Sequence, residues 1–226
     1  MDETVLIVPG FHGSGPAHWQ SWLQARTPQA RRVSGIDWES PVLPEWSSAI
    51  HAGIEQSTGS VWLVAHSFGC LASVVAASER PDRIAGLLLV APADPERFSS
   101  SGVRQQSGYD FVESSIVNLL PQSGLERLPS VVVASEDDPW LDFENARDWA
   151  ERWGSSLINL GQAGHINTDS GYGPWPFAQE LLLAMHKGRT PALTEADAND
   201  LSRQIERLES SQGWRSFSRR PIEFAW

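Results

Sequence analysis

Cysteine, basic residues and long apolar runs are scarce in this sequence. A single cysteine, Cys70, excludes an intrachain disulfide framework and a cysteine-based zinc cluster. No run of about 18 apolar residues is present, so no membrane-spanning helix is expected. The start Met1-Asp2-Glu3 is acidic, whereas a secretory signal begins with basic residues. Together these absences predict a cytoplasmic protein in a reducing compartment.

The deficit of basic residues also limits the partners that the protein is expected to bind. Aspartate and glutamate number 28 against 17 lysines and arginines, which gives a net charge of -11. Nucleic acid and anionic membranes repel such a charge, so neither is an expected partner. The remaining composition, with 41% hydrophobic residues in a chain of 226, is typical of a soluble globular protein with one main domain.

Short apolar runs rich in β-branched residues alternate with segments of helical spacing. Strands are expected at 4–8, 61–65, 84–90, 131–134 and 156–160, with a weaker one at 32–33, and helices at 16–26, 45–56, 68–79, 143–153 and 176–185. Strands that alternate with helices pair in parallel, because each right-handed crossover returns the chain to the same end of the sheet. The pattern predicts an α/β fold, a mostly parallel sheet with helices on both faces.

Two segments interrupt the alternation. Residues 94–129 are loop-like, with one short helix expected around 111–120, and are expected to form a small lid. Residues 188–191 are typical of a linker, and a helix with the apolar stripe Leu201, Ile205 and Leu208 is expected after it. We therefore divide the chain into an α/β domain, 1–187, and a C-terminal helical and aromatic extension, 188–226. The extension either docks on its own domain or forms a homodimer contact.

A serine lies where an expected strand runs into an expected helix. A sharp strand-to-helix turn exposes a serine hydroxyl at the edge of the sheet, and it requires small residues two positions before and after the serine. Ala65 and Gly69 flank Ser67 in this way, with Ala65 a departure from the usual glycine. The amide of Phe68 begins the helix and is placed to donate to an oxyanion. The alternative is that Ser67 is an ordinary helix cap.

A base and an orienting acid follow two later strands. His165 lies on a glycine-rich loop after the strand at 156–160, and carboxylates follow the strand at 131–134. The order Ser67, Asp138, His165 is that of a Ser-Asp-His triad in α/β hydrolases. His66, beside the serine, is given at most a supporting role.

Three neighbouring carboxylates compete for the orienting position. They are Glu136, Asp137 and Asp138. Pro139 fixes the chain directly after Asp138, which favours Asp138, and the other two are expected to be solvated or to cap the next helix.

The glycine-rich loop after the first strand suits a second oxyanion donor, for which we select the amide of Phe11. The loop has neither the ending of a phosphate-binding loop nor a dinucleotide fingerprint. The six histidines show no paired ligand spacing, so no metal and no cofactor are expected.

Tryptophan is abundant, with 11 residues against 2 tyrosines, and some of these rings are expected to line a pocket. Phe11, Trp140 and Trp175 lie close in sequence to the expected catalytic loops and predict a small aromatic acyl pocket. The alternative is that Trp140 and Trp175 are ordinary core rings.

Five segments in order resemble a known family: PGFHGSGPAHW (9–19), AHSFGC (65–70), APADP (91–95), ASEDDP (134–139) and GHINTDSGYGPW (164–175). They are similar to the small α/β hydrolases of the YdeN and retinoblastoma-binding-protein type, over about residues 4–186. The resemblance implies an α/β-hydrolase fold with a minimal lid, a triad of Ser67, Asp138 and His165, and hydrolysis of small carboxylic esters.

Two functions of different classes fit the sequence. The first is a serine hydrolase acting on small-molecule esters through an acyl-enzyme intermediate, with thioesters, lactones and amides left open as substrates. The second is a catalytically weak protein-interaction module, favoured by the tryptophan content and the C-terminal extension.

Overall fold

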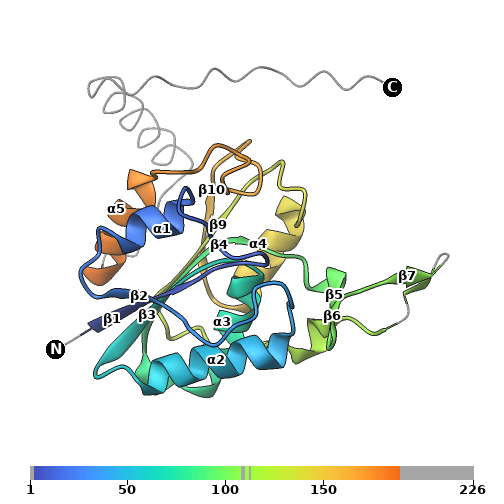
Figure 1. The fold of residues 1–226 in the computed structure, drawn as a ribbon, viewed down its shortest axis with the longest axis horizontal. Helices are drawn as coiled ribbons and strands as arrows, with labels where there is room; N and C mark the ends of the chain where they lie inside the picture. The colour runs from blue at the N-terminus through green and yellow to red at the C-terminus, as the bar shows by residue number, and fades with distance from the viewer. Residues whose placement is uncertain (1–2, 108–109, 112, 189–226) are drawn as a thin grey trace. The chain divides into compact units, whose positions relative to one another are not determined.

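The computed structural model describes residues 3–107, 110–111 and 113–188. A parallel sheet of six strands lies at its centre, in the order β10-β9-β4-β3-β1-β2 (Figure 1). The strands are β1 (Glu3–Val8), β2 (Ala30–Arg32), β3 (Ser60–Ser67), β4 (Ile84–Pro92), β9 (Ser130–Ala134) and β10 (Ser156–Asn159). All five neighbouring pairs are parallel, which confirms the predicted sheet.

Helices cover both faces of this sheet. They are α1 (Trp19–Gln24), α2 (Leu43–Glu55), α3 (Phe68–Glu79), α4 (Phe143–Arg152) and α5 (Pro176–His186). Helices α1 and α5 lie together on one face, and α2 and α3 lie side by side on the other (Figure 1). The predicted helix at 16–26 begins only at Trp19, because the His18 ring caps it by accepting a hydrogen bond from the Gln20 amide.

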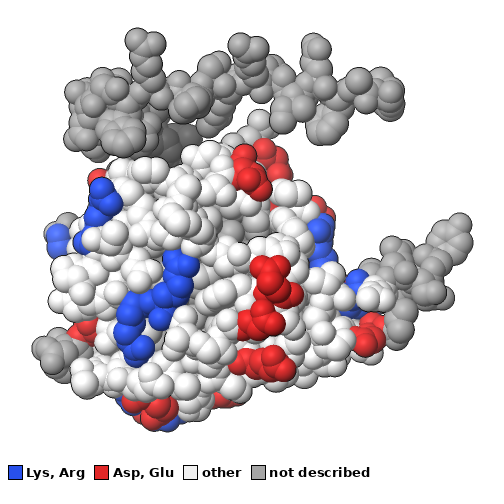
Figure 2. Space-filling view, in the orientation of Figure 1, with Lys and Arg blue, Asp and Glu red and all other residues white. Residues whose placement is uncertain are grey.

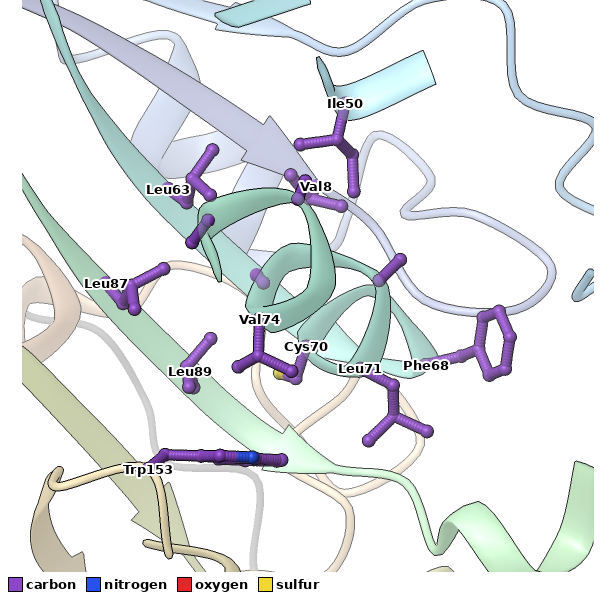
Figure 3. Packing of buried hydrophobic residues seen from close by; sticks show 14 of the residues in the cluster. Val8, Ile50, Leu63, Phe68, Cys70, Leu71, Val74, Leu87, Leu89 and Trp153 are labelled. Carbon is purple, nitrogen blue, oxygen red and sulfur yellow. The ribbon is translucent and has the colours of Figure 1, made fainter. Parts of the chain in front are cut away.

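The core on the α2 and α3 side follows from the two-residue period of the strands. Alternate residues of β3 and β4, such as Leu63 and Leu87, point toward α3, where Val74 packs against them (Figure 3). Strands β3 and β4 are buried on both faces, as expected for the centre of a parallel sheet. Burial of both central strands fixes their register and hence the position of the turn at Ser67.

The insertion between β4 and β9 differs from the prediction. It contains two short hairpins, β5 (Phe98–Ser99) with β6 (Gly102–Val103) and β7 (Gln106–Ser107) with β8 (Asp110–Phe111). The helix predicted around 111–120 is wrong over most of its length, since only a 3₁₀ turn at Ile116–Leu119 forms. Asp110 and Phe111 pair in β8 instead, so the chain is extended where the predicted helix would begin.

The insertion is anchored beside the turn at Ser67. The Phe98 ring packs on that of Phe68, with 4.6 Å between ring centroids, and Ile116 and Leu120 are buried in the same core. Its short elements agree with the minimal lid expected for this fold class.

Charge is distributed unevenly over the surface. On the face of Figure 2, acidic and basic side chains gather in separate patches. Within the described ranges, no helix is long and apolar enough to cross a bilayer. The predicted extension at 188–226, with its cis-docking and homodimer alternatives, lies outside the described residues except for Gly188, and the domain boundary stays a prediction.

We expect Gly86→Ala to destabilise the fold, since a Cβ at Gly86 would lie 2.7 Å from the Pro129 carbonyl oxygen and would collide with the Trp62 ring. Overpacking of this kind costs about 1–3 kcal/mol of unfolding free energy. The matched control is Gly15→Ala, because a Cβ at Gly15 would meet no atom within 4 Å. Urea denaturation measures both, and equal midpoints for the two variants would contradict the packing around β4.

Candidate active site

Four loops meet where the parallel strands end. Because all six strands run in the same direction, the residues that follow β1, β3, β9 and β10 gather at one edge of the sheet. The sequence-predicted residues Phe11, Ser67, Asp138 and His165 lie in or at the start of these four loops. Strand direction therefore brings together residues as far apart in sequence as Phe11 and His165.

Ser67 occupies the sharp turn between β3 and α3. Its backbone has φ 54° and ψ -128°, a strained conformation for a residue with a side chain. A Cβ at Gly69 would collide with the Pro9 carbonyl oxygen, so glycine is required there. Ala65 is fully buried, and its methyl group is accommodated despite the departure from glycine.

The side chain of Ser67 does not act as a helix cap. It makes no capping hydrogen bond to α3, and its Oγ lies 2.9 Å from Nε2 of His165. The other ring nitrogen of His165, Nδ1, lies 2.9 Å from both carboxylate oxygens of Asp138. The three side chains thus form one continuous hydrogen-bonded chain.

The three candidate carboxylates have different partners. Asp138 faces His165, and its Oδ1 also accepts a hydrogen bond of 2.8 Å from the Trp140 amide. Asp137 Oδ1 instead accepts from Ser135 Oγ and from the Gly164 amide, both at 2.7 Å. Only Asp138 among the three is placed to orient the histidine ring.

Asp137 secures the loop that carries His165. Burial acts to raise the pKa of Asp137, but hydrogen bonds from Ser135 and the Gly164 amide outweigh it and lower that pKa. Glu136 is exposed and accepts from Asn159 at 2.9 Å. Neither carboxylate caps the next helix, contrary to one of the expected alternatives, because α4 begins only at Phe143.

Two further histidines lie behind His165. His66 Nε2 lies 2.9 Å from the backbone carbonyl oxygen of His165, so this nitrogen carries the proton and donates it. The His18 ring packs on His66 with 4.9 Å between centroids. Sequence reasoning gave His66 a supporting role and missed His18, which it placed inside the helix expected at 16–26.

Burial keeps both of these histidines neutral. Desolvation is the main cause that lowers the pKa of His66 well below its ordinary value. Desolvation, with smaller contributions from Arg32 and His165, lowers the pKa of His18 to about 4.

The loop after β1 passes directly over Ser67. A Cβ at Gly10 would lie 2.6 Å from the Ser67 Cβ, so only glycine fits at this crossing. Phe11 follows, and within the described part of the chain neither its amide nor that of Phe68 donates to a protein acceptor. Neither amide is therefore committed to an acceptor among the described residues.

The two predicted pocket tryptophans have different surroundings. Trp140 is half-buried, with its ring centroid 5.9 Å from that of His165 and the Arg97 guanidinium 5.1 Å from it. Trp175 is 7% exposed and packs edge-on against Trp19 at 5.3 Å. Trp175 therefore has the surroundings of the core-ring alternative, whereas Trp140 borders the His165 ring.

A surface cavity lies away from these four loops. A cavity of about 580 Å³ opens at the start of β1 and beside α5, where Glu3, Thr4, Leu182 and His186 line it. That is the opposite end of the strands from Ser67. Across the residues that the structure describes, no group of three His, Cys, Asp or Glu side chains is placed to hold a metal ion.

The fold and the strained serine turn are those of an α/β hydrolase. The chain belongs to the serine hydrolase family, whose model matches residues 5–184. A YdeN-like hydrolase from Pectobacterium atrosepticum is 34% identical, with 82% of this chain and 91% of that chain covered and a TM-score of 0.70. YdeN of Bacillus subtilis is 25% identical over 197 residues, 84% of this chain and 100% of the relative. Its solved structure matches with a TM-score of 0.64. The protein is thus a small serine hydrolase of the YdeN type.

The buried, neutral His18 makes stability depend on pH. Its pKa in the folded protein, about 4, lies below the ordinary 6.5, so the unfolded chain binds a proton that the folded chain does not. Folding stability is therefore lost as the pH falls from 6.5 toward 4.

The variant His18→Asn tests this pH dependence, because it retains a side chain able to cap α1 but does not titrate. We expect a smaller loss of unfolding free energy between pH 7 and pH 4.5 in this variant, measured by urea denaturation. An unchanged pH dependence would contradict the burial of His18.

Proposed function

We propose that the protein hydrolyses small carboxylic esters through a triad of Ser67, His165 and Asp138. The observation that carries this proposal is the continuous chain from Ser67 Oγ through the His165 ring to the Asp138 carboxylate, each link 2.9 Å long. A serine needs an adjacent base to become a nucleophile, and the base needs a partner that orients it.

The first half of the reaction forms an acyl-enzyme. His165 Nε2 takes the proton of the Ser67 hydroxyl while Oγ attacks the ester carbonyl carbon. The carbonyl oxygen becomes an oxyanion, and the amides of Phe68 and Phe11 donate to it. When the tetrahedral intermediate collapses, His165 returns the proton to the departing alcohol.

The second half releases the acid. His165 takes a proton from water, whose oxygen attacks the acyl carbon, and the proton then returns to Ser67 as the carboxylic acid leaves. Asp138 holds Nδ1 of His165 as the protonated nitrogen and stabilises the imidazolium that forms in both halves. Side chains, amides and water supply every group in this cycle, so it requires no cofactor.

The proposed substrate is a small molecule with a short acyl group. The Trp140 ring beside His165 offers an aromatic wall close to the reacting atoms, and Phe11, which follows Gly10 at its contact with Ser67, is the second proposed wall. The short insertion between β4 and β9 supplies little surface for a long acyl chain. The single cysteine and the charge of -11 favour a cytoplasmic location and argue against nucleic acid or membrane partners.

The interaction-module alternative explains fewer of these features. A binding scaffold has no need of a strained serine backbone or of a buried histidine between a serine and a carboxylate. The serine hydrolase family assignment also supports an enzyme.

Ser67→Ala tests the nucleophile. We expect kcat/KM for p-nitrophenyl acetate to fall by about 10³-fold or more, because the members of a triad act as a unit. Labelling by a fluorophosphonate should disappear, while the thermal midpoint stays near that of the wild type. Turnover close to wild type in the folded variant would refute the assignment.

Asp138→Asn and Asp137→Asn form a matched pair. An amide at Asp138 favours the wrong tautomer of His165, so kcat should fall by about 10⁴-fold. An amide at Asp137 still offers an oxygen to Ser135 and to the Gly164 N–H, so kcat should fall by less than about tenfold. Steady-state kinetics on the same ester compares the two variants. Equal losses of kcat would contradict the assignment of Asp138 as the orienting acid.

A further inference from the structure

Gln20 is a buried polar residue in α1 that the proposed reaction does not use. Its exposed fraction is 0%, yet its side chain is fully hydrogen-bonded. Nε2 donates to the carbonyl oxygens of Val8 and Val64, both at 3.1 Å, and Oε1 accepts from the Ser14 hydroxyl at 2.6 Å. Both protons of the amide nitrogen are thus committed to backbone carbonyls of two different strands.

The two carbonyls lie just before the two loops that meet at the site. Val8 ends β1, and the loop with Phe11 follows it, whereas Val64 lies three residues before Ser67 in β3. The strands are paired with Val8 opposite Ala65. Pro9 has no N–H and cannot extend the ladder toward the site. The side chain of Gln20 therefore joins the two strands at the last paired residues of their backbone ladder.

The separation of these strand ends sets the geometry above Ser67. A Cβ at Gly10 would lie 2.6 Å from the Ser67 Cβ, so the two loops are already at contact distance. A small displacement of the end of β1 relative to β3 moves the Phe11 amide relative to Ser67 Oγ. Oxyanion donors act only within a narrow range of about 2.7–3.1 Å, so such a displacement weakens the donor.

Ser14 links Gln20 to the loop between β1 and α1 as well. It lies within the loop and is 5% exposed. Its hydroxyl donates to Gln20, and its carbonyl oxygen accepts from Arg32 of β2 at 2.7 Å. Gln20 is therefore bound at three points: the end of β1, the strand that leads to Ser67, and the loop between β1 and α1.

We propose that Gln20 is a positioning residue, which fixes the distance between the Ser67 hydroxyl and the Phe11 amide by joining the ends of β1 and β3. This inference rests on the proposed function. It assigns Gln20 an effect on the transition state, through the oxyanion, and not on the binding of the ester itself.

The test compares Gln20→Glu and Gln20→Leu with the wild type. Glutamate has the same shape but no N–H to offer the two carbonyls, and leucine has a similar volume but no polar atoms. We expect kcat for p-nitrophenyl acetate and the single-turnover acylation rate to fall by about 10-fold to 100-fold, below the 10²–10³ of a lost oxyanion donor. The Ki of a trifluoromethyl ketone, which forms an oxyanion on Ser67, should rise by the same factor. The Ki of the product acetate should stay within about threefold of wild type.

Gln24 provides the matched control. It lies one turn further along α1, is half-buried, and its side-chain amide makes no hydrogen bond with the described residues. Gln24→Glu and Gln24→Leu should leave kcat and both Ki values unchanged. Variants at Gln20 with a lower melting temperature but wild-type kcat, acylation rate and ketone Ki would show a merely structural role and overturn the inference.

Ser14→Ala carries the test if the Gln20 variants do not fold. It removes one hydrogen bond from Gln20 and leaves both strand contacts, so we expect a threefold to tenfold loss in kcat with a parallel rise in ketone Ki. No change in either value would overturn the inference. If the proposed function is wrong, the wild-type protein will show no fluorophosphonate labelling at Ser67. That result would also overturn the inference about Gln20, which rests on the proposed function.

Discussion

The contact between the loop after β1 and the turn at Ser67 is the constraint on which the site depends. Glycine is required on both sides of it, at Gly10 and at Gly69, because a side chain at either position would overlap the opposite backbone or Cβ. At this contact the Ser67 backbone is strained, and the amides of Phe11 and Phe68 have no acceptor among the residues that the structure describes. The register of β1 against β3 and the buried amide of Gln20 keep the two loops in place.

Hydrogen bonds also hold the backbone of the loop that carries His165. The backbone N–H of His165 donates to Ser170 Oγ at 3.0 Å, and the carbonyl oxygen of His165 accepts from His66 Nε2 at 2.9 Å. One residue earlier, the Gly164 amide donates to Asp137. The ring of His165 is therefore oriented by Asp138 on a backbone that is already fixed, which is the preorganisation that acyl transfer requires. The two adjacent carboxylates thus bind different groups: Asp137 binds the backbone of the loop, and Asp138 binds the ring of His165.

The order and type of the main elements follow from local patterns in the sequence. Apolar, β-branched runs at the expected strand positions lie within two residues of the strands found, and α3 forms over the predicted range because its small and apolar residues bury against the sheet. Parallel strands end at one edge, so Ser67, Asp138 and His165 were expected to lie together from chain order alone. Pro139 was the local signal that favoured Asp138 over Asp137, and Asp138 is the one of the two whose carboxylate contacts His165.

Other features depend on contacts between segments that are distant in the sequence, and the sequence did not predict them. The two hairpins at 98–103 and 106–111 were not predicted, because such short strands carry no periodicity that a sequence reveals. Trp175 lies in a buried aromatic cluster that Trp19 completes from α1. His66 contacts a backbone carbonyl 99 residues away, and Gln20 contacts one 44 residues away. Such bonds leave no local pattern in the chain, since each partner is an ordinary backbone carbonyl that any residue would supply.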